Sequence, residues 1–289
     1  GNPINAHGGG LLYHNGTYYW YGEYKKGKTI LPDWATWECY RTDVTGVGCY
    51  SSKDLLNWKF EGIVLPAVKD DPNHDLHPSK VLERPKVIFN KKTGKFVMWA
   101  HVESADYSKA CAGVAVADSP VGPFVYQGSF RPNNAMSRDQ TVSVDDDGRA
   151  YQFYSSENNE TMYISLLTDD YLKPSGRFTR NFVKESREAP AVFKYNGKYY
   201  FSYSTGDTHQ LCYAIGDNPY GPFTYQGVIL TPVVGWTTHH AICEFQGKWY
   251  LFHHDSVPSG GRTWLRSLKV CELEYNADGS IKTIEGGGK

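Results

Sequence analysis

Short runs of aromatic and other apolar residues recur along the chain, each directly after a glycine turn. Five such runs follow Gly16, Gly94, Gly148, Gly197 and Gly247. Asn-Gly or Asp-Gly precedes three of these runs, and both pairs are type I′ hairpin signals because both central residues need a positive φ. We find no long segment with apolar residues at i, i+3, i+4 and i+7, so the pattern predicts strands throughout.

The spacing of these turns predicts a repeated unit. After the first interval the turn glycines lie about 50 residues apart, a period typical of β-propeller blades. Residues 118–128 and 217–227 also share nearly the same sequence, so two repeats end alike. The long first interval is expected to hold an insertion at about residues 25–50. We predict an all-β chain in which residues 1–289 form a single five-bladed β-propeller domain.

The amino-acid composition is typical of a β protein and limits the kinds of partner that the chain can bind. Aromatic residues make up 15% of the chain, beside 29 Gly and only 3 Met. The 30 basic and 31 acidic residues give a net charge of −1, which provides no overall attraction to nucleic acid. No apolar stretch is long enough for a membrane span. So many aromatic rings also suit sugar binding, although core packing and β-propensity explain most of them. We expect an oligo- or polysaccharide partner, no nucleic acid, no membrane span and a monomer.

The six cysteines do not have zinc-site spacing. Four of them lie in strand-like apolar runs and are expected to be buried thiols. Cys39 and Cys49 lie in the predicted insertion, and the sequence leaves open whether they are bridged. The terminal residues 286–289 are expected to be frayed.

Three carboxylates are predicted at the starts of inner strands. Asp139 and Glu188 each lie nine residues before a turn glycine, and Glu83 lies eleven before a longer turn. Inner strands of a propeller converge on one mouth of the central channel. An isolated acidic residue at a strand start is usually a turn cap, but three at matched positions favour a site. Histidines occupy corresponding places in the first and last repeats: His7, His239 and His240.

Carboxylates that lie close together change one another's pKa. They raise one another's pKa, which keeps one of them protonated near neutral pH. A protonated acid beside ionised carboxylates is what a glycoside hydrolase needs. An arginine accompanies each carboxylate (Arg84, Arg138 and Arg187) and is expected to fix its rotamer or to hold sugar hydroxyls.

Several motifs together resemble glycoside hydrolase family 43. They are Asn-Ala-His-Gly-Gly-Gly at 5–10, Glu-Arg-Pro-Lys at 83–86, Ser-Arg-Asp at 137–139, Arg-Glu-Ala-Pro at 187–190 and Thr-His-His at 238–240, with residues 249–255 and Gly261-Arg262 in the last repeat. The resemblance implies a five-bladed propeller that hydrolyses with inversion, Glu188 as general acid and Asp139 as the residue that orients it and tunes its pKa. It implies no required cofactor, with His240 near the axis beside either a structural calcium ion or an ordered water.

One departure concerns the general base. The family's usual base is an Asp at the first inner strand, where this chain has His7-Gly8. The family branch acting on β-1,3-galactan also lacks that Asp and shares the first motifs, but its glutamine from the final blade has no evident equivalent here. From about residue 202 the chain looks more like the arabinofuranosidase and xylosidase branches. Glu83 is the first candidate for the base, the alternative being that it only binds a sugar hydroxyl; Glu23 is a weaker candidate.

These observations predict an exo-acting, inverting glycoside hydrolase of plant-type polysaccharide side chains, with galactose from β-1,3-galactan favoured. The alternatives are an α-L-arabinofuranosidase or β-xylosidase of the same family, or an inactive sugar-binding propeller. No signal segment is present, and an extracellular or periplasmic location is expected. The predicted catalytic residues are Glu188, Asp139 and Glu83, and the predicted sugar-binding residues are His7, Glu23, Arg138, Trp236, His240 and Arg262.

Overall fold

The computed structural model describes residues 3–31 and 40–288, which form five antiparallel sheets. Blade 1 contains β1 (His7–His14), β2 (Thr17–Ile30), β3 (Arg41–Ser52) and β4 (Lys59–Pro66). Blade 2 contains β5 (Val81–Asn90), β6 (Lys95–Glu103), β7 (Cys111–Ala117) and β8 (Val125–Phe130). Blade 3 contains β9 (Arg138–Val144), β10 (Ala150–Ser156), β11 (Thr161–Leu167) and β12 (Pro174–Asn181). Blade 4 contains β13 (Ser186–Tyr195), β14 (Lys198–Thr205), β15 (Leu211–Gly216) and β16 (Thr224–Leu230). Blade 5 contains β17 (Ala241–Phe245), β18 (Lys248–Asp255) and β19 (Ser267–Leu273).

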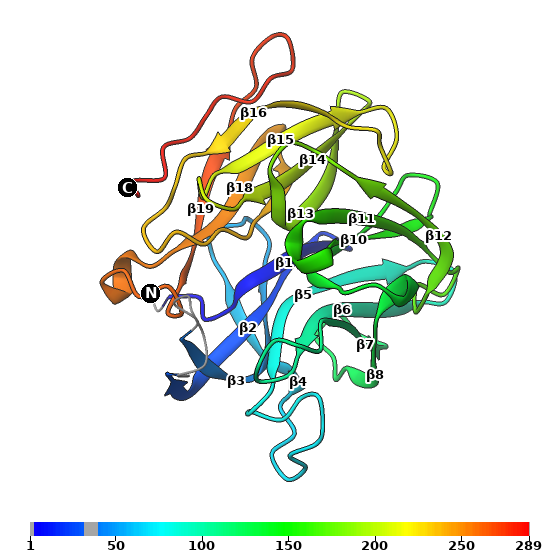
Figure 1. The fold of residues 1–289 in the computed structure, drawn as a ribbon, viewed down its shortest axis with the longest axis vertical. Helices are drawn as coiled ribbons and strands as arrows, with labels where there is room; N and C mark the ends of the chain where they lie inside the picture. The colour runs from blue at the N-terminus through cyan, green and yellow to red at the C-terminus, as the bar shows by residue number, and fades with distance from the viewer. Residues whose placement is uncertain (1–2, 32–39, 289) are drawn as a thin grey trace.

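The innermost strands close a ring around a central axis (Figure 1). Each contacts the next in the order β1, β5, β9, β13, β17, and β17 contacts β1 again. In the described part of the chain, three short 3-10 helices lie in loops: η1 (Pro132–Asn134), η2 (Glu157–Asn159) and η3 (Val257–Ser259). The predicted five-bladed β-propeller is therefore confirmed. The predicted insertion is in part an extension of the hairpin, because β2 and β3 stay paired as far as Ile30 and Arg41.

Aromatic side chains fill the space between neighbouring blades. Trp20 of blade 1 stacks on Phe252 of blade 5 at a ring-centroid distance of 5.3 Å. Trp99 of blade 2 donates its indole N–H to the Tyr171 carbonyl of blade 3 at 2.8 Å. Both tryptophans are essentially inaccessible to solvent. Burial of such large rings stabilises the interfaces that hold the blades together, so most of the aromatic content serves the core.

The C-terminal segment packs on blade 4. Ile284 N–H donates to the Ile229 carbonyl at 2.8 Å, and Gly288 N–H donates to the Pro232 carbonyl at 2.8 Å. Gly286 and Gly288 lie so close to the backbone of residues 231–233 that a Cβ at either would collide with it. The prediction of a frayed end is thus wrong for residues 286–288.

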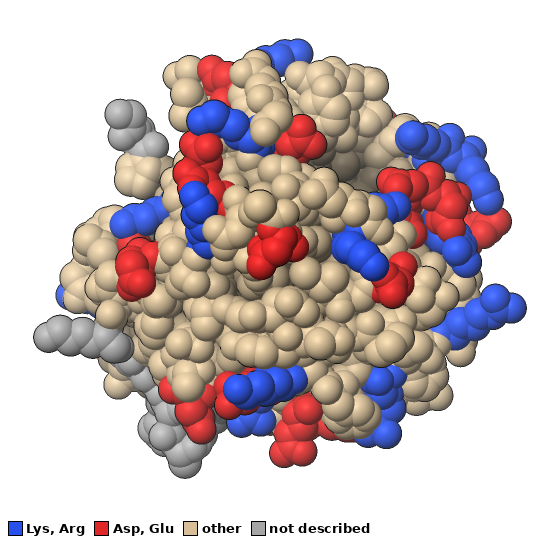
Figure 2. Space-filling model, turned by 90° about the horizontal axis from the view of Figure 1, so that it is seen from above, with Lys and Arg blue, Asp and Glu red and all other residues tan. Residues whose placement is uncertain are grey.

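The cysteines of the described residues are free thiols. Cys49, Cys111 and Cys212 are buried, and Cys243 and Cys271 are partly buried. Cys39 lies outside the described residues. None of the helices that the structure describes is long and apolar enough to cross a membrane. On the face shown in Figure 2, basic and acidic side chains are interspersed rather than gathered by sign.

Candidate active site

Each of the first four inner strands breaks its pairing register near its start. Such breaks occur after His7 in β1, after Glu83 in β5, opposite Phe153 and Ser155 in β9, and after Glu188 in β13. Bulges of this kind turn side chains out of the regular alternation and are frequent beside active sites.

A residue with left-handed backbone lies at each of these breaks. The φ angles are 66° at Gly8, 54° at Arg84, 44° at Asp139 and 50° at Ala189. Three of these four residues carry a Cβ, so the conformation is strained there. The same bulge thus recurs in four blades, and at each one the backbone turns side chains toward the mouth of the propeller.

The pairing register corrects the predicted equivalence of the three carboxylates. Glu83 pairs with His101 and Glu188 pairs with Ser204, but in blade 3 the paired residue is Arg138, opposite Ser155. Asp139 comes one residue later, at the left-handed position. Counting from Gly148 misplaced it because the blade 3 turn is long: Val144 pairs with Ala150, whereas Tyr195 pairs with Lys198 in blade 4.

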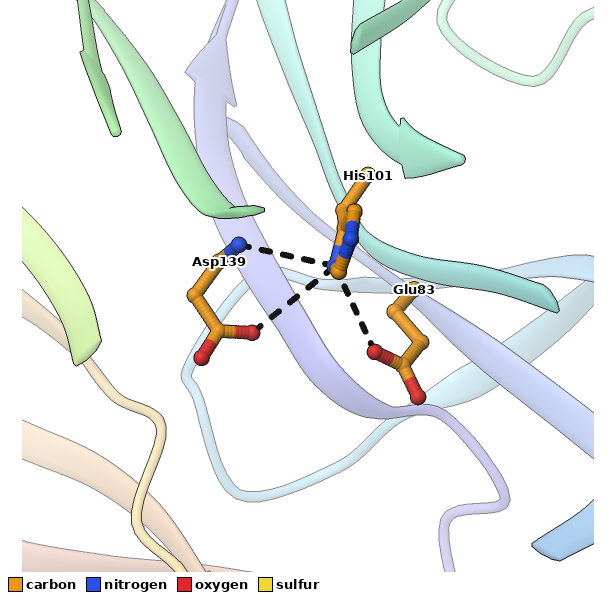
Figure 3. Close-up of side chains that lie close together, drawn as sticks. All are labelled: Glu83, His101 and Asp139. Atoms are coloured by element: carbon orange, nitrogen blue, oxygen red, sulfur yellow. Dashed lines mark hydrogen bonds and ion pairs between the residues drawn. The ribbon is translucent and has the colours of Figure 1, made fainter. Parts of the chain in front are cut away.

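Asp139 and Glu83 nevertheless meet around one imidazole (Figure 3). His101 Nδ1 lies 3.4 Å from Glu83 Oε2 and 4.0 Å from Asp139 Oδ1. Arg84 donates from Nε to Asp139 Oδ1 at 2.9 Å, and Tyr107 donates its hydroxyl to Glu83 Oε1 at 2.8 Å. Both carboxylates are thus held by cationic or hydroxyl donors from blade 2.

These contacts favour a protonated His101 and an ionised Glu83. Burial opposes a charge on His101, but hydrogen bonds to Glu103 and Glu83 raise its pKa to about 9. Burial would raise the pKa of Glu83, yet the His101 contact and the charge on Arg84 lower it to about 2. At neutral pH Glu83 is therefore a carboxylate beside an imidazolium.

Glu188 has the opposite character. The residue is half-buried, and its Oε1 accepts a long hydrogen bond of 3.4 Å from Asn159 Nδ2. Burial and the negative charge of Asp139 raise the pKa of Glu188 to about 7, while Arg84 and Arg266 partly offset this. Glu83 also contributes to the rise. A carboxylic acid with this pKa can donate a proton near neutral pH.

Glu23 belongs to a second cluster on blade 1. His7 Nε2 lies 2.8 Å and Lys25 Nζ lies 3.3 Å from Glu23 Oε2, and Arg84 donates its backbone N–H to Glu23 Oε1 at 3.1 Å. Burial would raise the pKa of Glu23, but His7, Lys25 and Arg84 together hold it well below its usual range. Burial lowers the pKa of His7 to about 4, so the imidazole is neutral. Gly8 leaves the room that Glu23 Oε1 occupies, since a Cβ there would lie 2.5 Å from that atom.

Buried histidines of blade 5 line the opposite side. Lys86 reaches across from blade 2, with its Nζ 2.7 Å from His239 Nε2 and 3.0 Å from the Gly8 carbonyl. His240 Nε2 lies 2.6 Å from Ser202 Oγ. Burial lowers the pKa of His240 to about 3 and that of His239 well below its usual range. These imidazoles are therefore uncharged.

The remaining predicted sugar-binding residues have different surroundings. Arg138 donates from Nε to Glu103 Oε1 at 3.2 Å and from an Nη to the Tyr107 carbonyl at 2.6 Å, so its contacts are with protein groups. Arg262 is exposed, and Trp236 is half-buried with its ring 5.1 Å from that of His209. The structure does not bring Arg262 to the carboxylates.

Sequence reasoning missed four residues of this region: His101, Glu103, Tyr107 and Arg266. Arg266 acts electrostatically on Glu188, Glu23 and His7, an influence on the site that had not been expected of this residue. A signal for two of the four existed, because His101 and Glu103 interrupt an otherwise apolar strand with polar residues on one face. Arg266 follows a loop, where no periodicity marks the residue that turns inward.

Neither group of candidate metal ligands fits a divalent cation. Ligand atoms of Glu83, His101 and Asp139 lie within 4.8 Å of one another, but a protonated His101 and Arg84 already satisfy the carboxylates. The axial cavity beside His240 has a volume of about 150 Å³ and is lined by Lys86 and no carboxylate. Calcium takes six to eight oxygen ligands, so an ordered water suits His240 better.

Three known proteins are similar to this chain in sequence or in structure. The chain is 48% identical to a xylosidase/arabinosidase of Bacteroides ovatus over 233 residues, covering 68% of this chain and 71% of that protein. A solved β-1,3-galactosidase with galactodeoxynojirimycin superposes with a TM-score of 0.82 at 31% identity, covering 98% of this chain and 94% of that one. A β-xylosidase/α-arabinofuranosidase from a compost metagenome, in a calcium-free form with xylotriose, gives 0.80 at 34% identity and covers 96% and 93%.

The family model described as Glycosyl hydrolases family 43 matches residues 11–281, which includes every strand except part of β1. The relatives are named as glycosidases acting on several different sugars. With the propeller and its three carboxylates, this match shows that the chain belongs to glycoside hydrolase family 43 and is a glycosidase.

Proposed function

We propose that residues 1–289 form one catalytic domain that removes a terminal sugar with inversion of the anomeric carbon. The observation that carries the proposal is the opposed charge state of two carboxyls at one mouth: Glu188 with a pKa of about 7 and Glu83 with a pKa of about 2. An inverting glycosidase needs one protonated and one ionised carboxyl group, with water between the ionised group and the sugar.

In this mechanism Glu188 transfers its proton to the glycosidic oxygen as the bond from that oxygen to the anomeric carbon breaks. A water attacks the anomeric carbon from the opposite face, and its proton passes to Glu83. Asp139 raises the pKa of Glu188 and stays fixed by Arg84. Afterwards Glu83 releases its proton to solvent and Glu188 takes one up, which restores the starting state.

The first candidate substrate is β-1,3-linked galactan, cleaved from its non-reducing end. It is supported by a site whose carboxylates come from blades 2, 3 and 4 while His7 and Gly8 occupy the first inner strand, and by the similarity to the β-1,3-galactosidase. The second candidate is a terminal xylose or arabinofuranose, supported by the 48% identity to the xylosidase/arabinosidase. We further propose that the protein acts as a monomer outside the cytoplasm on such polysaccharides.

The test is sugar release from aryl β-D-galactopyranoside, β-D-xylopyranoside and α-L-arabinofuranoside, and from β-1,3-galactan. Proton NMR during turnover identifies the anomer that forms first. We expect galactose, released initially as the α-anomer from β-linked substrates. Exclusive turnover of xyloside or arabinoside would select the second candidate, and a first product of retained configuration would overturn the mechanism. Binding of galactan without turnover of any substrate would support an inactive sugar-binding propeller.

A further inference from the structure

Glu103 lies at the end of β6, behind the site, with no accessible surface. Its Oε1 lies 3.3 Å from His101 Nε2 and accepts a hydrogen bond from Arg138 Nε at 3.2 Å. A buried carboxylate costs free energy unless its partners hold it in the charged form. Here the contacts with His101 lower the pKa of Glu103 although burial acts in the opposite direction. The buried Glu103 carboxylate therefore contacts both His101 and Arg138, and each of these residues is connected to Glu83.

The first path runs through His101. Its Nε2 faces Glu103, and its Nδ1 faces Glu83 and, at longer range, Asp139. The Asp139 backbone N–H also lies 3.5 Å from Nδ1, a contact that would suit a neutral ring. Three carboxylates around the ring outweigh this long contact and favour the imidazolium, which donates from both nitrogens. Glu103 thereby fixes the plane of the ring through Nε2. Figure 3 shows the other ring nitrogen, Nδ1, facing Glu83 and Asp139.

The second path runs through Arg138 and Tyr107. Arg138 binds Glu103 through Nε and the Tyr107 carbonyl through an Nη at 2.6 Å. Tyr107, whose φ is 58°, then donates its hydroxyl to Glu83 Oε1 at 2.8 Å. The left-handed backbone at Tyr107 is one that a tyrosine rarely adopts unless neighbouring contacts hold it. Tyr107 thus holds Oε1 of Glu83 and His101 holds Oε2. His101 contacts Glu103 directly, and Tyr107 is connected to it through Arg138.

We infer that Glu103 is a positioning residue for hydrolysis, which holds Glu83 in its water-facing orientation through His101 on one oxygen and through Arg138 and Tyr107 on the other. The inference rests on the proposed function, in which Glu83 accepts the proton of the attacking water. Glu103 itself is fully buried, so it acts on Glu83 through other side chains. A misorientation of the base by about 1 Å is enough to cost on the order of 100-fold in rate.

The test compares wild type with Glu103→Gln, which keeps the size of the side chain and removes its charge. The substrate is β-D-galactosyl fluoride, or the fluoride of whichever sugar the aryl glycosides identify. Because fluoride departs with little protonation, its hydrolysis depends on the base and largely bypasses Glu188. We expect kcat on the fluoride to fall about 10- to 100-fold with KM changed less than threefold.

The pH dependence of fluoride hydrolysis distinguishes the proposed role from a purely structural one, because a structural role would leave its alkaline limit unchanged. His101 is faced by Glu83 from β5, by Glu103 from β6 and by Asp139 from β9, with Arg84 and Arg138 behind these carboxylates. Loss of the Glu103 charge lets His101 lose its proton at lower pH. The alkaline limit of fluoride hydrolysis should therefore move down by at least one pH unit in Glu103→Gln and stay in place in Glu103→Asp, which keeps the charge.

Asp75→Asn is the matched control. Asp75 precedes β5 and, like Glu103, is a carboxylate with several donors, Tyr126 and Ser129 among them, but it lies away from Glu83. We expect lower thermal stability and an unchanged pH profile. An unchanged kcat and alkaline limit in folded Glu103→Gln would overturn the inference alone. If Glu103→Gln does not fold, a wild-type rate on the fluoride in Tyr107→Phe, which removes the hydroxyl that holds Glu83 Oε1, would overturn it. Wild-type protein inactive on fluorides and aryl glycosides would instead overturn the proposed function.

Discussion

The mouth of the propeller has two sides that are built differently. On the carboxylate side, Arg84 acts on Glu83, Asp139 and Glu188, and His101 lies beside Glu83 and Asp139. On the histidine side, His7, His239 and His240 are buried and uncharged. The two sides meet where Arg84 contacts both Asp139 and Glu23. The proposed proton transfers therefore lie on the first side, while the histidines of the second supply shape and neutral hydrogen-bonding groups.

The difference follows from what surrounds each group. An imidazole that is buried without a carboxylate loses its proton, as His240 does, whereas His101 keeps its proton because three carboxylates surround it. The same residue type thus has a pKa of about 3 in one place and about 9 in the other. Substitutions that alter one side alone test whether this division is real.

The largest effect is expected from Glu188→Gln. The amide cannot donate the proton that the leaving oxygen needs, so kcat on the natural linkage should fall about 1000-fold, equivalent to about 4 kcal/mol of activation free energy. Steady-state kinetics on galactan oligosaccharides measure it, with the exposed neighbour Glu185→Gln as the control. More than a tenth of wild-type activity in Glu188→Gln would assign the acid to another residue.

Glu23→Gln should lower the free energy of unfolding, because Glu23 lies where the two sides meet. Removing this charge leaves Lys25 largely buried without its carboxylate, and breaking such a pair costs about 3 kcal/mol of unfolding free energy. Urea denaturation measures the change. Glu61→Gln, whose partner Lys59 is exposed, should change stability by less than about 1 kcal/mol. Equal stability losses in the two variants would mean that the Glu23 cluster is not an energetically distinct unit.

Asp139→Asn should shift a pH limit. Glu188 donates its proton only below its pKa of about 7, so wild-type activity on aryl glycosides should decline as the pH rises through about 7. The Asp139 charge raises that pKa, and its removal should move the alkaline limit down by about one unit. The surface variant Asp146→Asn should leave the limit in place. An alkaline limit that does not move in Asp139→Asn would remove Asp139 from its assigned role.

The smallest effect is expected from removing metal ions. Because no carboxylate lines the axial cavity beside His240, dialysis against EDTA should leave both the activity and the melting temperature unchanged. Activity assays and differential scanning fluorimetry, with and without added calcium, make the comparison. A loss that calcium reverses and magnesium does not would place a calcium ion on the histidine side after all.

Much of this molecule could be predicted from the chain alone. Asn-Gly turns followed by aromatic runs have few conformational options, and their period fixes the number of blades. Glu83, Asp139 and Glu188 could be selected because inner strands of a propeller begin at a common mouth. Local sequence determines these features because hairpin turns and strand alternation depend on residues close together in the chain.

Only the tertiary structure decided how these residues work together. Counting from a turn glycine placed Asp139 level with Glu188, whereas the longer turn of blade 3 moves it to a left-handed position one residue further on. Arg266 rather than Arg262 acts on the site, and a buried Glu103 supports both partners of Glu83. The sequence determined which residue types reach the mouth. Their charge states depend on burial and on neighbours from other blades, and these arise only when the ring closes.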